Sequence, residues 1–229
     1  MNSNVVGKLQ PYYDDPPDEL VSHFATPPLL HAPDLFINLL NLDDSLAYTD
    51  GIQHTFISKS LGLFVLDDAN NSNPFCYVTR GPARGLILQL KHDDASAFAF
   101  SSLSSFLGAI ADAIETRKTI DSLVFDTAFP TVSQSKLAAY LQGQCNHGGI
   151  AEVICAMITL LREPPADLVG SLAGHEDFFV RESIADFITL HPREALLPAA
   201  TILSVDPCAQ VARPGQRAVD AIRQLEKPR

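Results

Sequence analysis

Three short apolar runs in the first half of the chain constrain its fold more than any other feature. They are LGLFVL (residues 61–66), FCYVT (75–79) and GLILQL (85–90). The intervening segments, DDANNSNP and RGPARG, have turn compositions, because Asn and Asp tolerate left-handed backbone angles, Gly adopts them freely and Pro fixes a bend. Short apolar runs bounded by such turns predict an antiparallel meander of at least three strands.

A serine-rich segment follows the third run and predicts a helix. Ser101 or Ser102 can cap its N-terminus, since a serine side chain accepts a hydrogen bond from a free backbone N–H of the first turn. Apolar residues then recur at helical spacing and make one face: Leu103, Phe106, Leu107, Ile110 and Ile114. The first half is therefore predicted to be a sheet with a helix packed on it.

The N-terminal region, residues 1–50, differs in charge and in proline content. It holds eight acids and one lysine, a net charge of −7, whereas the whole chain of 229 residues has a net charge of −11. Proline interrupts long helices and central strands, so we expect an extended, irregular lead-in with short pieces of structure. One such piece is a short helix over residues 34–42, capped by Asp34. The prolines are Pro11, Pro16, Pro17, Pro27, Pro28 and Pro33.

The chain beyond about residue 126 shows no convincing strand and predicts helices over 135–144, 149–163 and 164–174. Residues 172–190 weakly resemble residues 203–225, with a leucine, an acid, a valine followed closely by arginine, and a terminal apolar face. Two-helix repeats of the HEAT type have this pattern. The alternative is an ordinary helical bundle that happens to repeat, and two copies do not decide between them.

The predicted fold class is α+β: an antiparallel sheet with packing helices, followed by an all-α region of possible HEAT type. We expect two parts, residues 1–125 and residues 126–229. The segment IAEVICAMITLL (residues 150–161) is too apolar for a solvated arm. The helical part is therefore expected to pack on the first part rather than move freely.

Two residue pairs are candidates for chemistry, and neither forms a recognisable site. His92 and Asp93 are adjacent, so in a strand they would point to opposite faces. Cys145 and His147 are near neighbours at a helix boundary, whereas catalytic Cys and His usually meet through the fold. The chain has no H-E-x-x-H, G-x-S-x-G or phosphate-binding glycine loop, and its four cysteines form no C-x-x-C pair. We therefore predict no catalytic residue, no metal site and no cofactor.

The location of the protein follows from similar arguments. Four scattered thiols suggest a reducing compartment. The N-terminus has no apolar signal core, and no stretch approaches the length of a membrane span. We expect a cytoplasmic protein that binds neither nucleic acid nor membranes, because phosphate binding needs clustered Lys and Arg.

The order of motifs in LFVLDDANNSNPFCYVTRGPARGLILQLKHDD, followed by Ser and Phe-Leu at a helix start, resembles the SUKH superfamily of the Smi/Knr type. The resemblance covers about residues 51–115. Its elements are an apolar strand ending in acids, an aromatic strand, the turn from Gly81 to Gly85, an apolar strand ending in His92-Asp93, and Phe106-Leu107. The family usually begins with a helix and a Pro…Tyr…Phe-Leu segment, which the acidic lead-in replaces here.

The resemblance implies a non-enzymatic α+β binding domain with no fixed catalytic residues. Many members resemble immunity proteins that are encoded beside a secreted bacterial toxin or effector and block its active site. Such toxins are often basic, and an acidic inhibitor would gain association rate and specificity from that. We therefore predict an immunity protein whose partner-binding residues are Asp14, Asp15, Asp18, Glu19, Asp43 and Asp44.

Two other functions are compatible with the sequence. The first is a scaffold or regulatory module that binds proteins through the helical tail, since stacked helical repeats present extended surfaces. The second is an enzyme that uses His92 or Cys145. For the six acids, the simpler explanation is that each is an ordinary solvated loop acid.

Overall fold

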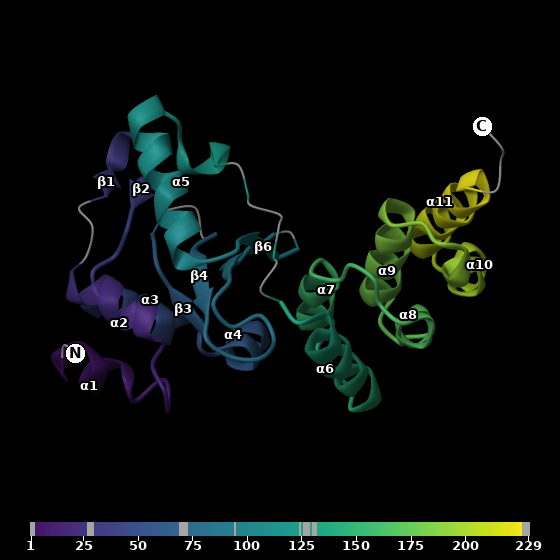
Figure 1. The fold of residues 1–229 in the computed structure, drawn as a ribbon, viewed down its shortest axis with the longest axis horizontal. Helices are drawn as coiled ribbons and strands as arrows, with labels where there is room; N and C mark the ends of the chain where they lie inside the picture. The colour runs from purple at the N-terminus through teal and green to yellow at the C-terminus, as the bar shows by residue number, and fades with distance from the viewer. Residues whose placement is uncertain are drawn as a thin grey trace. The chain divides into compact units, whose positions relative to one another are not determined.

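The computed structural model describes residues 3–26, 30–68, 73–93, 95–123, 125, 129 and 132–225. The chain divides into two compact units, Met1–Thr131 (unit 1) and Val132–Arg229 (unit 2). Unit 1 combines helices with two small antiparallel sheets, and the described residues of unit 2 are helical (Figure 1). The predicted fold class, α+β followed by an all-α region, is confirmed.

The main sheet of unit 1 has four antiparallel strands in the order β3-β4-β5-β6. The three predicted strands are confirmed, and the fourth, with the sequence AFAF, was not predicted. Positive φ angles at Gly81 (73°) and Gly85 (94°) shape the turn between the second and third strands. The predicted turn before the second strand lies partly on residues 69–72, outside the described residues. The strands are β3 (Leu63–Val65), β4 (Phe75–Val78), β5 (Ile87–Gln89) and β6 (Ala97–Phe100).

Both faces of this sheet are buried. Neighbouring residues of one strand point to opposite faces, and Phe64 and Tyr77 are buried on one face while Leu63 and Val78 are buried on the other. The first face belongs to a core that also includes side chains from the helices of unit 1. A sheet with two apolar faces needs cover on both sides, so the remaining elements of unit 1 must supply it.

Helix α5 (Leu103–Thr116) supplies part of this cover, and its predicted cap is confirmed. The Ser102 hydroxyl accepts a hydrogen bond from the Ser105 backbone N–H at 3.0 Å, and the Ser105 hydroxyl accepts one from the Ser102 N–H at 3.1 Å. This reciprocal pair satisfies two backbone donors at the helix start. The ring of Phe106 then lies 5.1 Å from the ring of Phe75 and 5.4 Å from that of Phe100.

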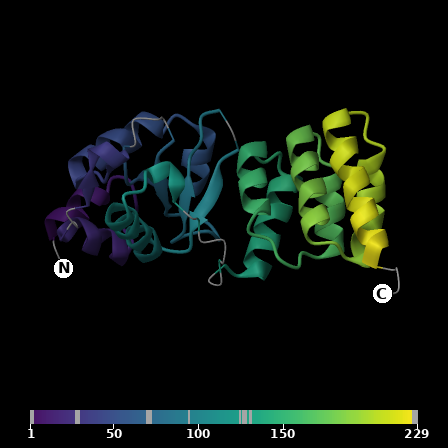
Figure 2. The ribbon, with the colours of Figure 1, turned by 90° about the horizontal axis from the view of Figure 1, so that it is seen from above.

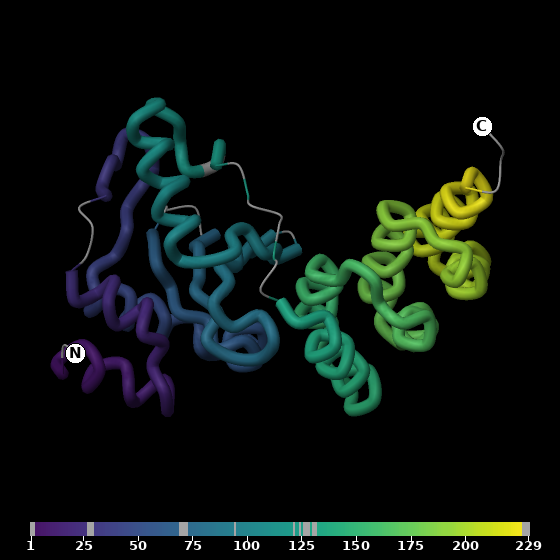
Figure 3. Tube along the Cα trace, viewed as in Figure 1, coloured from purple at the N-terminus to yellow at the C-terminus, as the bar shows by residue number. Residues whose placement is uncertain are grey.

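The prediction of an irregular lead-in is wrong, because most of the chain before β3 forms helices and short strands. Val5, Leu9, Leu20, Phe24 and Ile37 are buried in the same core as the sheet. Figure 3 traces this part of the chain in purple and blue. Its elements are α1 (Ser3–Leu9), α2 (Asp18–Ala25), β1 (His31–Ala32), a 3-10 turn (Pro33–Leu35), β2 (Ile37–Asn38), α3 (Leu42–Ile52) and α4 (Phe56–Leu61).

Proline marks the breaks between these elements rather than preventing them. Pro17 is the N-cap residue of α2, and Pro33 begins the 3-10 turn, where its fixed φ angle and missing N–H are tolerated. The predicted helix over residues 34–42 is also wrong. Phe36 has a left-handed φ of 58° and ends the 3-10 turn, and the true helix begins at Leu42 after the cap Asn41.

The outer edge of β3 is covered by residues of the N-terminal region. The Leu40 N–H donates to the Leu66 carbonyl and the Asp68 N–H donates to the Asn38 carbonyl, both at 3.0 Å. The Val65 N–H donates to the Thr49 hydroxyl of α3, also at 3.0 Å. An uncovered edge strand is a template for unwanted pairing, so these contacts protect the sheet as well as join it to the lead-in.

Asp67 lies at this edge and is fully buried. Its Oδ1 accepts a hydrogen bond from the Phe75 N–H at 2.6 Å, whereas Oδ2 has no partner among the described residues. Burial raises the pKa of Asp67 to about 7, the bond from Phe75 opposes this shift, and the neighbouring Asp68 adds to it. The folded state therefore favours the neutral carboxylic acid.

Replacing Asp67 with Asn should remove a pH dependence of stability. An unfolded Asp has a pKa near 4, so between about pH 4 and pH 7 the folded state binds more protons, and the free energy of unfolding falls as pH rises. The free energy of unfolding of Asp67→Asn, relative to that of the parent, should therefore rise by about 2–4 kcal/mol as the pH is raised from 4 to 8. Urea unfolding followed by tyrosine fluorescence measures this, since four of the five tyrosines lie in unit 1.

The control for this experiment is Asp112→Asn, which changes an exposed carboxylate on α5. Its stability should follow that of the parent across the pH range. Parallel pH curves for Asp67→Asn and the parent would show that Asp67 is ionised in the folded protein at neutral pH.

The described residues of unit 2 form three pairs of α-helices that pack side by side (Figure 2), with a 3-10 turn (Glu194–Leu196) before α10. Leu141, Leu172 and Leu203 are fully buried at equivalent positions in the first helix of each pair. The second helices pack on one another in the order α7, α9, α11. The helices are α6 (Gln134–Asn146), α7 (Ala151–Ile158), α8 (Ala166–Ala173), α9 (Phe178–Leu190), α10 (Leu197–Ser204) and α11 (Ala209–Leu225).

The internal resemblance in the sequence covers only the second and third pairs. In the first pair no acid lies between Leu141 and Ala151, and Val153 is not closely followed by an arginine, so the polar part of the motif is missing. The buried apolar positions are kept, as Val153, Val180 and Val211 show. The same buried apolar positions thus occur in three helix pairs, whereas the polar sequence motif occurs in only two of them.

Hydrogen bonds define two edges of this stack. At one edge, the Gln134 side chain at the start of α6 bonds the Leu160 carbonyl and the Arg162 N–H after α7, at 3.0 and 2.9 Å. Arg193, after α9, donates to the Pro164 carbonyl before α8 at 2.9 Å. The connections between pairs therefore share this edge, and the turns within pairs lie at the opposite edge.

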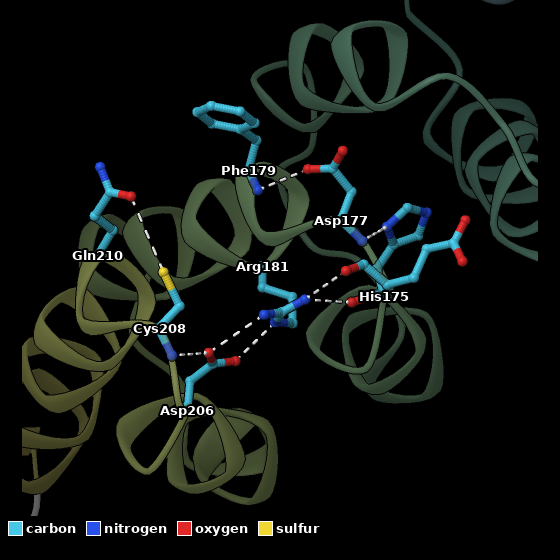
Figure 4. Close-up of polar contacts among 8 residues, drawn as sticks. His175, Asp177, Phe179, Arg181, Asp206, Cys208 and Gln210 are labelled. Carbon is cyan, nitrogen blue, oxygen red and sulfur yellow. Dashed lines mark hydrogen bonds and ion pairs between the residues drawn. The ribbon is translucent and has the colours of Figure 1, made fainter.

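Arg181 joins two of those turns (Figure 4). Its guanidinium donates to the Asp206 carboxylate at 2.7 and 3.3 Å, and to the carbonyls of His175 and Glu176 at 2.8 and 2.9 Å. Asp206 also accepts a bond from the Cys208 N–H at 2.8 Å. The side chains of Arg181 and Asp206 are only 15% and 8% exposed. This bidentate pair fixes the turn of the third pair against that of the second.

Helices α10 and α11 approach closely at Gly215. A Cβ atom at this position would lie 2.6 Å from the Ser204 nitrogen and 2.7 Å from the Leu203 carbonyl oxygen, whereas one at Gly170 would meet nothing within 4 Å. Gly215→Ala must therefore separate two backbones and should cost at least about 1–3 kcal/mol. Gly170→Ala should instead stabilise α8 by about 0.5–1 kcal/mol. Hydrogen exchange of the α8–α11 amides in urea measures both, and equal protection in the two variants would contradict the close approach.

Candidate partner-binding surface

The acidic segment, residues 14–19, connects α1 to α2 and is held at both ends by buried side chains. Tyr13 is buried, its ring packs 5.9 Å from that of Phe64, and its hydroxyl donates to the Leu63 carbonyl at 3.5 Å. Burial raises the pKa of Tyr13 well above its ordinary value. Pro17 is buried at the other end. The four acids, Asp14, Asp15, Asp18 and Glu19, are all exposed.

A shallow cavity of about 460 Å³ lies beside this segment and is lined by Pro17, Asp18, Glu19, Tyr77, Arg84 and Gly85. The Tyr77 hydroxyl donates a short hydrogen bond to the Glu19 carboxylate. Burial and the neighbouring Glu19 carboxylate raise the pKa of Tyr77 far above its usual range, so it remains a donor. Tyr77 thus fixes Glu19 against the sheet.

Arg84 is the cation of this cavity. It lies in the Gly81–Gly85 turn and contacts the Asp15 carboxylate at 3.5 Å and the Asp15 carbonyl at 3.4 Å. Both side chains are well exposed, so the ion pair contributes little to stability. It does hold the acidic segment next to the β4–β5 turn.

Asp43 and Asp44 form a second group, in the first turn of α3. Lys8 of α1 donates to Asp43 at 2.5 Å, and the Asn41 side chain donates to Asp44 at 2.6 Å while accepting from its N–H at 3.0 Å. Negative charge at a helix N-terminus is stabilising, so these acids have a structural use as well. The contacts of this group are to α1 and the α3 cap, whereas those of the acidic segment are to β4 and the β4–β5 turn.

The six predicted residues are therefore all exposed, but their contacts place them in two groups. Asp15, Asp18 and Glu19 come together with Tyr77 and Arg84, two residues that the sequence prediction did not include. Tyr77 is one of four buried residues of β4, and Arg84 lies in the turn between Gly81 and Gly85. Neither residue belongs to a sequence motif that would mark it as part of a binding surface. Their proximity to residues 15–19 depends on a contact between segments that are far apart in the sequence.

The other candidate pairs remain isolated. His92 Nδ1 lies 2.9 Å from Asp93 Oδ1 on an exposed loop, and the His92 N–H donates to the Asn73 side chain at 3.0 Å. Cys145 is half-buried in α6, where burial raises its thiol pKa, and His147 ends that helix. Among the described residues there is no group of three or more His, Cys, Asp or Glu that could hold a metal ion.

Comparisons with known proteins add no assignment: no family model, no curated protein and no solved structure matches this chain. In the part of the chain that the structure describes, no helix is both long and apolar enough to cross a membrane.

The hydrogen bond from Tyr77 to Glu19 can be tested against a similar bond elsewhere. Tyr77→Phe should cost about 1 kcal/mol, because it removes a charge-assisted bond at a half-buried site. Tyr48→Phe, which removes an exposed bond to Asp68, should cost less than about 0.5 kcal/mol. Urea unfolding gives both values, and hydrogen exchange should show earlier opening of the first turn of α2 in Tyr77→Phe alone. Equal losses would mean that Glu19 is not fixed by Tyr77.

Proposed function

We propose that this protein is an immunity protein, which binds a bacterial toxin or effector domain with a basic surface and blocks its active site. The observation that carries the proposal is the acidic segment: four exposed carboxylates in close succession, anchored by Tyr13 and Pro17. The SUKH-like order of motifs over residues 51–115 supports the same class. The net charge of −11 suits a basic partner.

The physical advantage of this segment is that its shape is set before binding. Glu19 is bonded to Tyr77, and Asp15 contacts Arg84, so two of the four acids lose little conformational freedom on association. Exposed acids around them would attract a basic surface over a distance of about one Debye length, roughly 8–10 Å. Such charges chiefly raise the association rate and the specificity.

This proposal places the protein in the cytoplasm, without a cofactor, a metal ion, nucleic acid or a membrane as its partner. A scaffold or regulatory module is the second candidate. The stacked helix pairs of unit 2 favour it, because such stacks offer extended surfaces for protein binding. An adjacent gene that encodes no toxin-like product would favour the scaffold.

The test is co-purification with the C-terminal domain of the adjacent gene's product, followed by calorimetry and association kinetics at low and high salt. We expect a one-to-one complex with nanomolar affinity or better, about −12 kcal/mol. Neutralising the acidic segment with Asp14→Asn, Asp15→Asn, Asp18→Asn and Glu19→Gln together should slow association about tenfold or more at low salt. It should also flatten the salt dependence.

The matched control neutralises four exposed acids elsewhere: Asp112→Asn, Glu115→Gln, Glu163→Gln and Glu194→Gln. It makes the same change in net charge, so it separates the acidic segment from the overall charge. If both sets slow association equally, only overall charge matters. If neither does, or if no complex forms, the proposed use of the segment is wrong.

A further inference from the structure

The turns within the three helix pairs of unit 2 share one edge of the stack, which we term the turn edge. It comprises residues 147–152, 174–181 and 204–210. The α7–α8 and α9–α10 connections lie at the opposite edge, as the Gln134 and Arg193 hydrogen bonds show. The Arg181 contacts join the second and third turns directly. The second and third turns thus form one continuous surface, and the first turn lies at the same edge of the stack.

The turn edge exposes large apolar side chains. The rings of Phe178 and Phe179 contact each other in a tilted arrangement, with their centroids 4.0 Å apart, and Phe179 is 54% exposed at the start of α9. Val205 is 77% exposed in the next turn. In Figure 4 the Phe179 ring points away from the Arg181–Asp206 pair rather than into the stack. Exposed aromatic residues on a rigid support are typical of the anchors of protein interfaces.

A cavity of about 470 Å³ opens at the first turn of the same edge. Its lining includes Tyr140, Gly143, Gln144, His147 and Ile150. The Tyr140 ring is half-buried, and burial raises the pKa of its hydroxyl. A Cβ atom added at Gly143 would meet nothing within 4 Å, so this side of the cavity faces open space. The cavity is therefore open to solvent and partly apolar, which suits a single apolar side chain.

Charge at the turn edge is negative. Its residues include Glu152, Glu176, Asp177 and Asp206 against Arg181 alone, a net charge of −3. The Arg181 guanidinium is already engaged by Asp206 and two carbonyls, which leaves it unsuited to an anionic partner. The exposed carboxylate of Glu176 would attract a cation to this edge, and the exposed ring of Phe179 offers it a face, since aromatic rings attract cations.

We propose that the turn edge is a docking surface for an extended segment of a partner protein that carries an Arg or Lys close to an apolar side chain. The cation lies over Phe179, where the negative charge of the turn edge favours it, and the apolar side chain enters the cavity at Tyr140 and Ile150. The Arg181 bonds hold the second and third turns in place before binding, which lowers the entropic cost. This surface belongs to unit 2 and does not depend on the function proposed for the acidic segment.

The test uses a displayed library of random linear dodecapeptides, selected on the full chain, with the best peptides then titrated in solution. Selected peptides should share a basic residue within a few positions of an aromatic or aliphatic one. Phe179→Ala and Glu176→Lys should each weaken their binding about tenfold, equivalent to about 1.4 kcal/mol. Tyr140→Ala should weaken it by a similar factor if the cavity holds the apolar side chain.

Matched controls lie at the opposite edge. Leu190 is 75% exposed at the other end of α9, and Glu163 is exposed in the α7–α8 connection, so Leu190→Ala and Glu163→Lys should leave binding unchanged. All these side chains are exposed or half-exposed, and circular dichroism checks the fold of each variant.

Three results would overturn the proposal. They are a library without enriched basic–apolar peptides, selected peptides whose binding is insensitive to Phe179→Ala and Glu176→Lys, and equal losses in the two control variants. Sedimentation adds a fourth: a dimer of the full chain that Phe179→Ala dissociates would mean that a second copy, not a basic segment, occupies the turn edge.

Discussion

The burial of both faces of the four-stranded sheet is the constraint on which unit 1 depends. Its strands are only three or four residues long, and a sheet this small is stable only when packing covers it. Helix α5 and the N-terminal helices supply that cover on the core face, and Thr49 and Asn38 close the edge of β3. The acidic N-terminal region is therefore structural as well as charged.

This constraint also explains why the acids of the segment are placed so firmly. Tyr13 is buried in the core and Pro17 is also buried, whereas the acids between and after them are exposed. Asp18 and Glu19 then occupy the first turn of α2, where negative charge is favourable. Each of these acids can thus serve the fold and a partner together, and a comparison of stability with affinity is needed to separate the two uses.

Unit 2 follows a different rule, since each helix pair buries its apolar face against the next one. The equivalent buried leucines of the first helices set the packing, and Arg181 fixes neighbouring turns by hydrogen bonds rather than by apolar contact. The last pair has polar side chains at some positions that are buried in the pair before it. Gln216, exposed and bonded to Asp220, stands in the third pair where the second pair has the buried Ala185.

Much of the fold could be predicted from local patterns, and the remainder depends on long-range contacts. Three strands, the Ser102 cap and the helices of unit 2 follow from periodicity and turn residues. The N-terminal helices were missed because frequent proline predicts an irregular chain, whereas Pro17 and Pro33 each stand at the start of an element. For the candidate surface, the sequence indicated exposed acids, but only folding brings Tyr77 and Arg84 to residues 15–19. The six acids could not be divided into two groups without the contacts of Lys8 and Asn41.

The most direct test of the proposed function is growth of cells that express the C-terminal domain of the adjacent gene's product, with and without this chain. We expect that the domain alone stops growth and that co-expression of the full chain restores it. A toxic domain that still stops growth, although the full chain accumulates in the same cells, would contradict it.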